Sequence, residues 1–200
     1  ILTPQTIKLD FENENWQILA TALIISVSGI LTNVIKVSTQ KQQNEGTKDK
    51  TLSYFRFFIP ISIITSLILY WSGWLKYDIS KTVYLFALML VISGLAIRYF
   101  AIMTLGSAFT VKIEIIKEHK LKTNGLYQRV RHPSYTGLLL YYLGLGLMMH
   151  NLASLLILTV IPLWVVLVRI EKEEKLLKNH FGEPYLKYQS ISHKLFPYIY

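Results

Sequence analysis

Five long blocks that carry almost no charge constrain this chain more than any other feature. They cover residues 16–37, 54–75, 82–105, 134–149 and 152–168. A helix of about 20 residues crosses a hydrocarbon core about 30 Å thick, so the first three blocks are long enough to span a membrane. The last two reach only roughly 25 Å each. Because only His150 and Asn151 separate them, we expect these two blocks to form a tight helical hairpin.

The predicted fold class is an all-α integral membrane protein with about five transmembrane helices, the last two paired as a hairpin. Apolar residues make up 52% of the chain and charged residues 16%, a low charged fraction for a soluble protein. A soluble helical bundle is the alternative. Each of its helices should then show a polar face, which disfavours that interpretation.

Basic residues concentrate on one side of the predicted membrane. The connections after the first and third blocks and the segment after the fifth are rich in Lys and Arg, whereas the opposite side holds Lys8, Lys76 and Lys81. Connections rich in Lys and Arg stay in the cytoplasm. We therefore expect a multi-pass protein of the endoplasmic reticulum or the bacterial inner membrane, with its polar site facing the cytoplasm. The net charge of +9 then reflects topology and attraction to membrane lipids, and it predicts no nucleic-acid partner.

The composition also restricts the chemistry. The chain contains no cysteine, which excludes thiol nucleophiles and thiolate ligands. It has five histidines, and no two of them show the i, i+4 spacing of a helical metal site. We therefore predict no metal site.

Polar side chains gather in residues 106–135 and again after the last block, and the hairpin should bring both regions to the same side. Proline is favoured in the first turn of a helix and restricts the residue before it, so Pro133 should open the fourth helix with His132 just outside. The free N–H groups of that turn favour an anionic group. The alternative is that Arg129 and Arg131 are only interfacial anchors.

The second polar region begins with Arg169 and Glu173, which are four residues apart and share one helix face. As an exposed ion pair they would contribute under about 1 kcal/mol to stability. Arg169 directly follows an apolar block, however, which places it close to the hydrocarbon core of the membrane. Gly182 should end this helix.

Two stretches resemble the isoprenylcysteine carboxyl methyltransferases, whose wider group includes the phospholipid N-methyltransferases of membranes. They read HKLKTNGLYQRVRHPSYTG and, after the hairpin, RIEKEEKLLKNHFGEPYLKY. The resemblance covers residues 98–197, and it implies S-adenosylmethionine as cofactor. It further implies a cytoplasm-facing pocket built from residues 106–135 and 169–197, and a lipophilic substrate that enters sideways from the bilayer. Residues 1–105 are then three N-terminal spans, and residues 106–200 form the catalytic region.

The resemblance also implies roles for individual residues. Arg169 matches an arginine on the substrate side and Glu173 a cofactor contact, and both are candidate catalytic positions. Lys122 stands where the family usually has valine. The implied cofactor-binding residues are His119, Lys120, Leu121, Lys122, Tyr127, His132, Pro133, Ser134, Tyr135 and Glu173.

The chemistry of methyl transfer favours a carboxylate as the methyl acceptor. A carboxylate is already ionised at pH 7 and needs no general base, and Arg169 can hold it through two hydrogen bonds. An amine would need deprotonation, for which a neighbouring arginine is unhelpful. Methylation of a lipid amine or another small hydrophobic nucleophile stays open. So do a non-enzymatic transporter or scaffold and a related-fold reductase that uses a nicotinamide.

Overall fold

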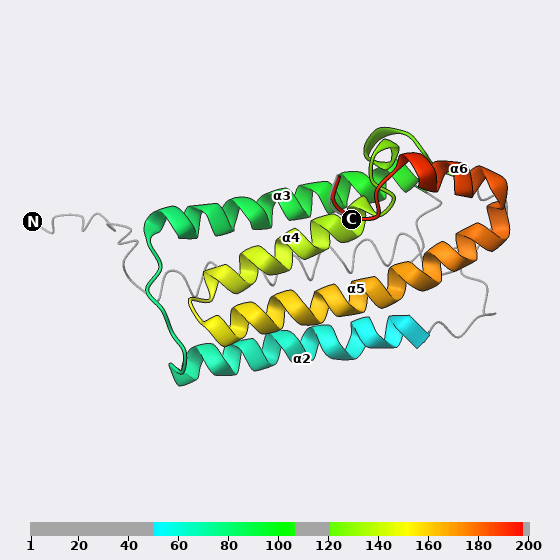
Figure 1. Cartoon of the computed structure of the whole chain (residues 1–200). Coiled ribbons are helices and arrows are strands. Elements are labelled where there is room, and N and C mark those ends of the chain that lie inside the picture. The colour runs from blue at the N-terminus through cyan, green and yellow to red at the C-terminus, as the bar shows by residue number, and fades with distance from the viewer. Residues whose placement is uncertain (1–49, 107–120, 198–200) are drawn as a thin grey trace, which may run out of the picture.

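The computed structural model describes residues 50–106 and 121–197. Every regular element in these two ranges is a helix, so the predicted all-α class is confirmed. Four long helices lie side by side in the spatial order α3, α4, α5, α2, and a short helix crosses one end (Figure 1). The elements are α2 (Lys50–Ser72), α3 (Lys81–Leu105), the 3-10 helix η3 (Gly125–Gln128), α4 (Pro133–Met148), α5 (Leu152–Phe181) and α6 (Glu183–Ile191).

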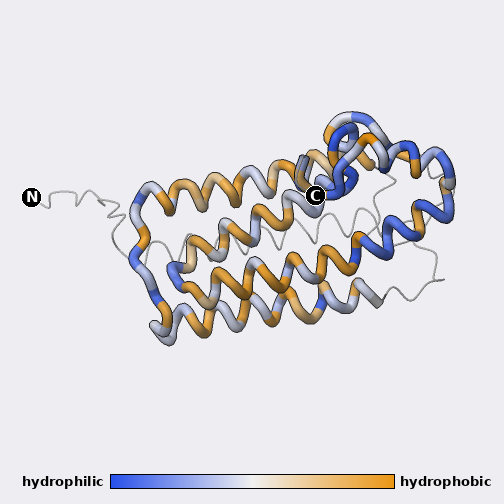
Figure 2. The backbone as a smooth tube through the Cα atoms, viewed as in Figure 1, coloured by the Kyte–Doolittle hydropathy of each residue, from blue (hydrophilic) through white to orange (hydrophobic). Residues whose placement is uncertain are grey.

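Three of these helices are long and apolar enough to cross a membrane: Thr51–Ser72, Lys81–Leu105 and Leu152–Phe181. The predicted fourth span corresponds to α4, which has 16 residues. The predicted first span, residues 16–37, lies outside the described residues. Hydrophobic residues line the length of the four long helices, and hydrophilic ones collect at the end of α5 and around α6 (Figure 2).

The outward faces of α2 and α3 present large apolar side chains. Phe57 and Trp71 of α2 are 65% and 77% exposed, and Phe86 and Met103 of α3 are 51% and 62% exposed. Large contiguous apolar surfaces of this kind mark contact with another apolar phase. These faces suit the hydrocarbon interior of a bilayer.

Local signals explain where the helices begin and end. The Ser80 side chain accepts a hydrogen bond from the Val83 N–H at 3.3 Å and caps α3. Pro133 takes the first turn of α4, as predicted. α5 continues beyond its apolar block to Phe181, and Gly182 ends it with a φ of 60°, a left-handed value that favours glycine.

The predicted hairpin turn between α4 and α5 is present and is anchored to α2. His150 has a φ of 48°, and the next residue, Asn151, is completely buried. The Asn151 Oδ1 accepts the Ser154 N–H at 2.9 Å and so caps α5. Its Nδ2 donates to the carbonyl of Leu69 at 3.3 Å and also to that of Trp74. One amide therefore joins the turn to the end of α2.

Glycines let α3 and α4 approach at backbone distance. A Cβ atom added to Gly94 would lie 2.6 Å from the carbonyl oxygen of Gly137. One added to Gly144 would lie 2.6 Å from the carbonyl oxygen of Ala87. Transmembrane helices commonly associate through small residues, because dispersion contacts must replace the hydrophobic effect there.

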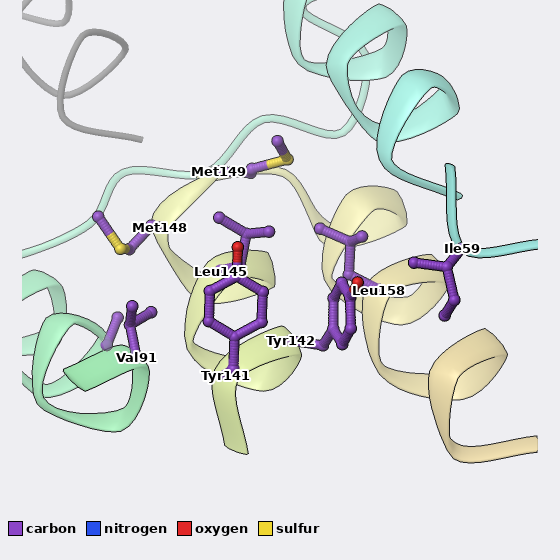
Figure 3. Packing of buried hydrophobic residues seen from close by; sticks show 9 residues of the cluster. Ile59, Val91, Tyr141, Tyr142, Leu145, Met148, Met149 and Leu158 are labelled. Carbon is purple, nitrogen blue, oxygen red and sulfur yellow. The ribbon is translucent and has the colours of Figure 1, made fainter. Parts of the chain in front are cut away.

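Two apolar clusters hold the bundle together. The larger one joins all four long helices near the hairpin turn (Figure 3). Its members include Ile59, Val91, Tyr141, Leu145 and Leu158. The smaller one, made of Val166, Ile170 and Leu195, lies toward the polar end of α5. This smaller cluster buries Leu195, which belongs to the C-terminal segment.

Candidate active site

The polar site is built where the segment before α4 pairs with the C-terminal segment. Val130 and His193 form a parallel bridge. The Arg131 N–H donates to the carbonyl of His193 at 2.8 Å, and the His132 N–H donates to that of Lys194 at 3.1 Å. The His193 N–H donates in turn to the carbonyl of Arg129 at 2.9 Å. The backbone that presents Arg131 and His132 is therefore held by a segment about 60 residues further along the chain.

Side chains reinforce this pairing. The Thr136 hydroxyl donates to the carbonyl of Leu195 at 2.6 Å. Leu195 is 2% exposed and packs on Val166 and Ile170 of α5. This segment belongs to the pocket that the family resemblance implies, but the sequence carries no signal for the pairing itself.

Arg169, Tyr135 and Glu173 form a continuous hydrogen-bonded chain. Arg169 Nε donates to the Tyr135 hydroxyl at 2.7 Å, and that hydroxyl donates to Glu173 Oε2 at 2.9 Å. Arg169 is only 5% exposed although it is a cation. A buried cation needs partners, and here the phenol connects it to the carboxylate four residues away on α5. This geometry differs from that of an exposed surface ion pair.

Two residues of α2 also contact Arg169. Its Nη1 donates to Thr51 Oγ1 at 3.3 Å, and its Cζ lies 5.5 Å from the centre of the Phe55 ring. The Phe55 ring is 6.5 Å from that of Tyr135. The sequence contained no periodic or motif signal that assigned α2 to the site.

Glu174, the neighbour of Glu173, connects three elements. Its Oε1 accepts from Arg131 Nε at 2.7 Å and lies 3.4 Å from His132 Nε2. Its Oε2 accepts from Gln189 Nε2 of α6 at 3.3 Å. The two adjacent acids therefore have different surroundings: Glu174 is embedded in a network, whereas the Glu173 side chain is 31% exposed. The sequence indicated only Glu173 as a site residue.

The opening of α4 is contacted by α3. Arg98 Nη1 donates to the Ser134 hydroxyl at 3.0 Å and to its carbonyl at 3.2 Å. The glycine-mediated approach of α3 and α4 brings this guanidinium to the start of α4. The Arg98 guanidinium therefore lies at the N-terminus of α4, where the sequence predicted that an anionic group would bind.

Two tyrosine hydroxyls donate to backbone carbonyls beside η3. Tyr127 donates to the carbonyl of Ala101 at 3.3 Å, and Tyr188 donates to the carbonyl of Tyr127. Burial raises the pKa of Tyr127, and it raises the pKa of Tyr188 to about 12. Both phenols therefore stay protonated at neutral pH and act as hydrogen-bond donors.

The predicted site residues fall into three groups. Leu121 and Lys122 are half-buried and lie just before η3. His119 and Lys120 lie outside the described residues. Among the described residues, no group of three or more His, Cys, Asp or Glu side chains could hold a metal ion. The residues that the structure brings to the site are Tyr127, His132, Pro133, Ser134, Tyr135, Arg169 and Glu173.

The helices and this site define a multi-pass, all-helical membrane protein with a polar site at one end of its bundle. Residues 87–179 match the model of the isoprenylcysteine carboxyl methyltransferase (ICMT) family. That part of the chain is similar to this family.

Individual relatives agree with the family match. Protein-S-isoprenylcysteine O-methyltransferase B of Arabidopsis thaliana is 41% identical over 105 residues, which are 52% of this chain and 53% of that protein. The protein-S-isoprenylcysteine O-methyltransferase of Xenopus laevis is 33% identical over 130 residues, which are 59% of this chain and 45% of that protein. The chain thus spans about half the length of these curated relatives.

A solved structure has the same fold. It is that of the eukaryotic intramembrane Ras methyltransferase ICMT without a monobody. The TM-score is 0.69 at 23% sequence identity, and the match covers 92% of this chain and 68% of that one.

Proposed function

We propose that this protein is an S-adenosylmethionine-dependent membrane methyltransferase that esterifies the carboxylate of an isoprenylcysteine-type lipophilic substrate. The observation that carries the proposal is Arg169, a buried guanidinium held by Tyr135 directly after an apolar transmembrane segment. The family match of residues 87–179 supports methyl transfer as the reaction class.

The residues at the site fit the charges of S-adenosylmethionine, which has a carboxylate, an amine and a sulfonium. Glu173 is partly exposed and suits the amine. The opening turn of α4, with His132, Pro133 and Ser134, suits the carboxylate through the positive end of its helix dipole, although the His132 N–H already donates to the carbonyl of Lys194 and Pro133 has no N–H. Tyr135 and Tyr127 complete the proposed cofactor site, together with residues 119–122. When bound, the cofactor supplies an activated methyl group.

The acceptor chemistry requires positioning more than proton transfer. A carboxylate acceptor is ionised at pH 7, so no base has to remove a proton from it. Arg169 can bind both carboxylate oxygens and aim one of them, and such orientation contributes much of the rate in displacement reactions. Burial excludes water and strengthens this electrostatic contact. In this proposal Arg169 and Glu173 are the catalytic pair, one on the acceptor side and one on the cofactor side.

The proposed site lies at the polar end of the bundle, and the basic connections of the sequence support a cytoplasmic position for that end. The lipophilic part of the substrate stays in the bilayer and reaches the site from between the helices. In this proposal, residues 106–200 form the catalytic region, and residues 1–105 form the three N-terminal transmembrane spans. The membrane is that of the endoplasmic reticulum or the bacterial inner membrane.

The test uses the purified chain in detergent with methyl-labelled S-adenosylmethionine and two acceptors: a farnesylated cysteine with a free carboxylate, and an aminophospholipid. Alkali should release the label as methanol from the cysteine product, because an ester is hydrolysed. Arg169→Lys should lower kcat/KM by about 100-fold, since a point charge cannot replace a bidentate contact. The matched control is Arg56→Lys, at an exposed position of α2.

Two results would contradict the proposal. Alkali-stable label on the phospholipid would indicate N-methylation, and it would remove the argument that Arg169 binds a carboxylate. Equal losses in the Arg169 and Arg56 variants would mean that the guanidinium has no special role.

A further inference from the structure

The α2 helix contributes to the site although it lies outside the part of the chain that matches the family. The match begins at residue 87, whereas α2 ends at Ser72. Thr51, in the first turn of α2, is 1% exposed. Its Oγ1 accepts a hydrogen bond from Arg169 Nη1 at 3.3 Å, across 118 residues of sequence.

Phe55 approaches the same guanidinium from one helical turn further along. It is four residues after Thr51, so both side chains lie on one face of α2. Its ring centre is 5.5 Å from Arg169 Cζ, within the range in which a cation is attracted to an aromatic ring. Phe55 also packs against both apolar clusters, which holds its ring in place.

Together these contacts restrict the orientation of the Arg169 side chain. Tyr135 holds Nε at 2.7 Å, Thr51 contacts Nη1, and the Phe55 ring lies against the guanidinium. An arginine side chain has several rotatable bonds, and a bidentate contact to a carboxylate needs the guanidinium plane in one orientation. Contacts that preset this plane reduce the conformational entropy that is lost when the acceptor binds.

We propose that Thr51 and Phe55 are positioning residues that act through Arg169, so that α2 helps to determine how tightly the acceptor carboxylate is bound. This inference rests on the proposed function, because it takes Arg169 as the group that binds the acceptor. Neither residue needs to touch the acceptor or the methyl donor. Their effect should therefore fall on the acceptor alone.

The test measures steady-state kinetics of the full chain in detergent, with N-acetyl-S-farnesylcysteine as acceptor and labelled S-adenosylmethionine as donor. Thr51→Ala and Phe55→Leu should each raise the acceptor KM by about fivefold or more, while the donor KM stays within about twofold. The conservative variants Thr51→Ser and Phe55→Tyr should restore acceptor KM values near that of the wild type, because they keep the hydroxyl and the ring.

The same helix offers matched controls. Ser53 is exposed, and Phe57 is 65% exposed. Ser53→Ala and Phe57→Leu remove the same groups from the outer face of α2 and should leave both KM values unchanged. Binding of S-adenosylhomocysteine, measured by thermal shift, reports whether each variant keeps a folded donor site.

Failure of this inference differs from failure of the proposed function. If the wild type methylates the acceptor but Thr51→Ala and Phe55→Leu leave its KM within twofold, the positioning role is wrong. The same holds if both variants weaken donor and acceptor equally, because that pattern indicates general destabilisation. A wild type that binds S-adenosylhomocysteine but forms no ester with the acceptor overturns the proposed function, and this inference with it.

Discussion

Adding one methyl group at Gly137 tests whether the contact between α3 and α4 supports the bundle. A Cβ atom at this position would lie 2.5 Å from the carbonyl oxygen of Gly94 and 2.7 Å from the backbone nitrogen of Arg98. Ordinary contact begins at 3.4 Å, so the helices must separate locally by 3.4 − 2.5 = 0.9 Å. Both atoms belong to backbone, so no side-chain rotation can relieve the overlap.

The expected cost follows from two opposing effects. Overpacking of a well-packed interior costs about 1–3 kcal/mol, and the rigid backbone atoms here favour the upper end. Alanine is the better helix former by about 1 kcal/mol, which offsets part of this. We therefore expect Gly137→Ala to lower the free energy of unfolding by about 2 kcal/mol, or roughly 30-fold in the equilibrium constant. Activity should fall as well, because the separation moves Arg98 away from Ser134.

The assay is reversible unfolding in mixed detergent micelles, followed by tryptophan fluorescence. Val160→Ile adds one carbon at a position that is 56% exposed and serves as the control. Combining Gly137→Ala with Gly94→Ala should cost less than the sum of the two, because one helix separation accommodates both methyl groups. A Gly137→Ala protein as stable as the wild type would refute the close approach of the two helices.

Three further outcomes can be checked. Glu174→Ala leaves the buried Arg131 without its carboxylate, so it should weaken S-adenosylhomocysteine binding by at least about tenfold in calorimetry. Glu171→Ala, at an exposed position of α5, is the control. Equal affinities of the two variants would contradict the role of Glu174 in the network. Asn151→Ala removes a helix cap and two hydrogen bonds to backbone carbonyls, so it should lower the free energy of unfolding by about 2–4 kcal/mol, more than Asn151→Asp, in the same unfolding assay. Tyr188 keeps its proton up to a pKa of about 12 in the folded protein, against 10.0 when unperturbed. Folded-state stability should therefore fall as the pH rises through this interval, and less steeply in Tyr188→Phe; identical pH profiles would contradict this.

The local features of the fold were predictable because they depend on near neighbours. Uncharged blocks indicated the long helices, and the two-residue break at His150 indicated the hairpin. Pro133 and Gly182 mark helix ends through their own backbone preferences. The helix that continues past the apolar block ends at Phe181, where Gly182 was predicted to end it.

Much of the candidate site could be anticipated through resemblance to a family, but its contacts could not. Spacing alone placed Arg169 and Glu173 on one helix face. It did not indicate that the Tyr135 hydroxyl would lie between them. Nor did it distinguish Glu173, which is partly exposed, from Glu174, which is surrounded by donors from α6 and from the segment before α4.

By itself, the sequence determined the membrane class, the four long helices that the structure describes, the hairpin, and the proline that opens α4. These properties follow from hydrophobic length and from backbone preferences that act over a few residues. Only the tertiary structure decided how distant segments meet at the site: the C-terminal segment pairs with residues 129–132, and α2 packs against Arg169. Such contacts depend on which helix faces pack together, and side chains more than 50 residues apart carry no local signal of their pairing.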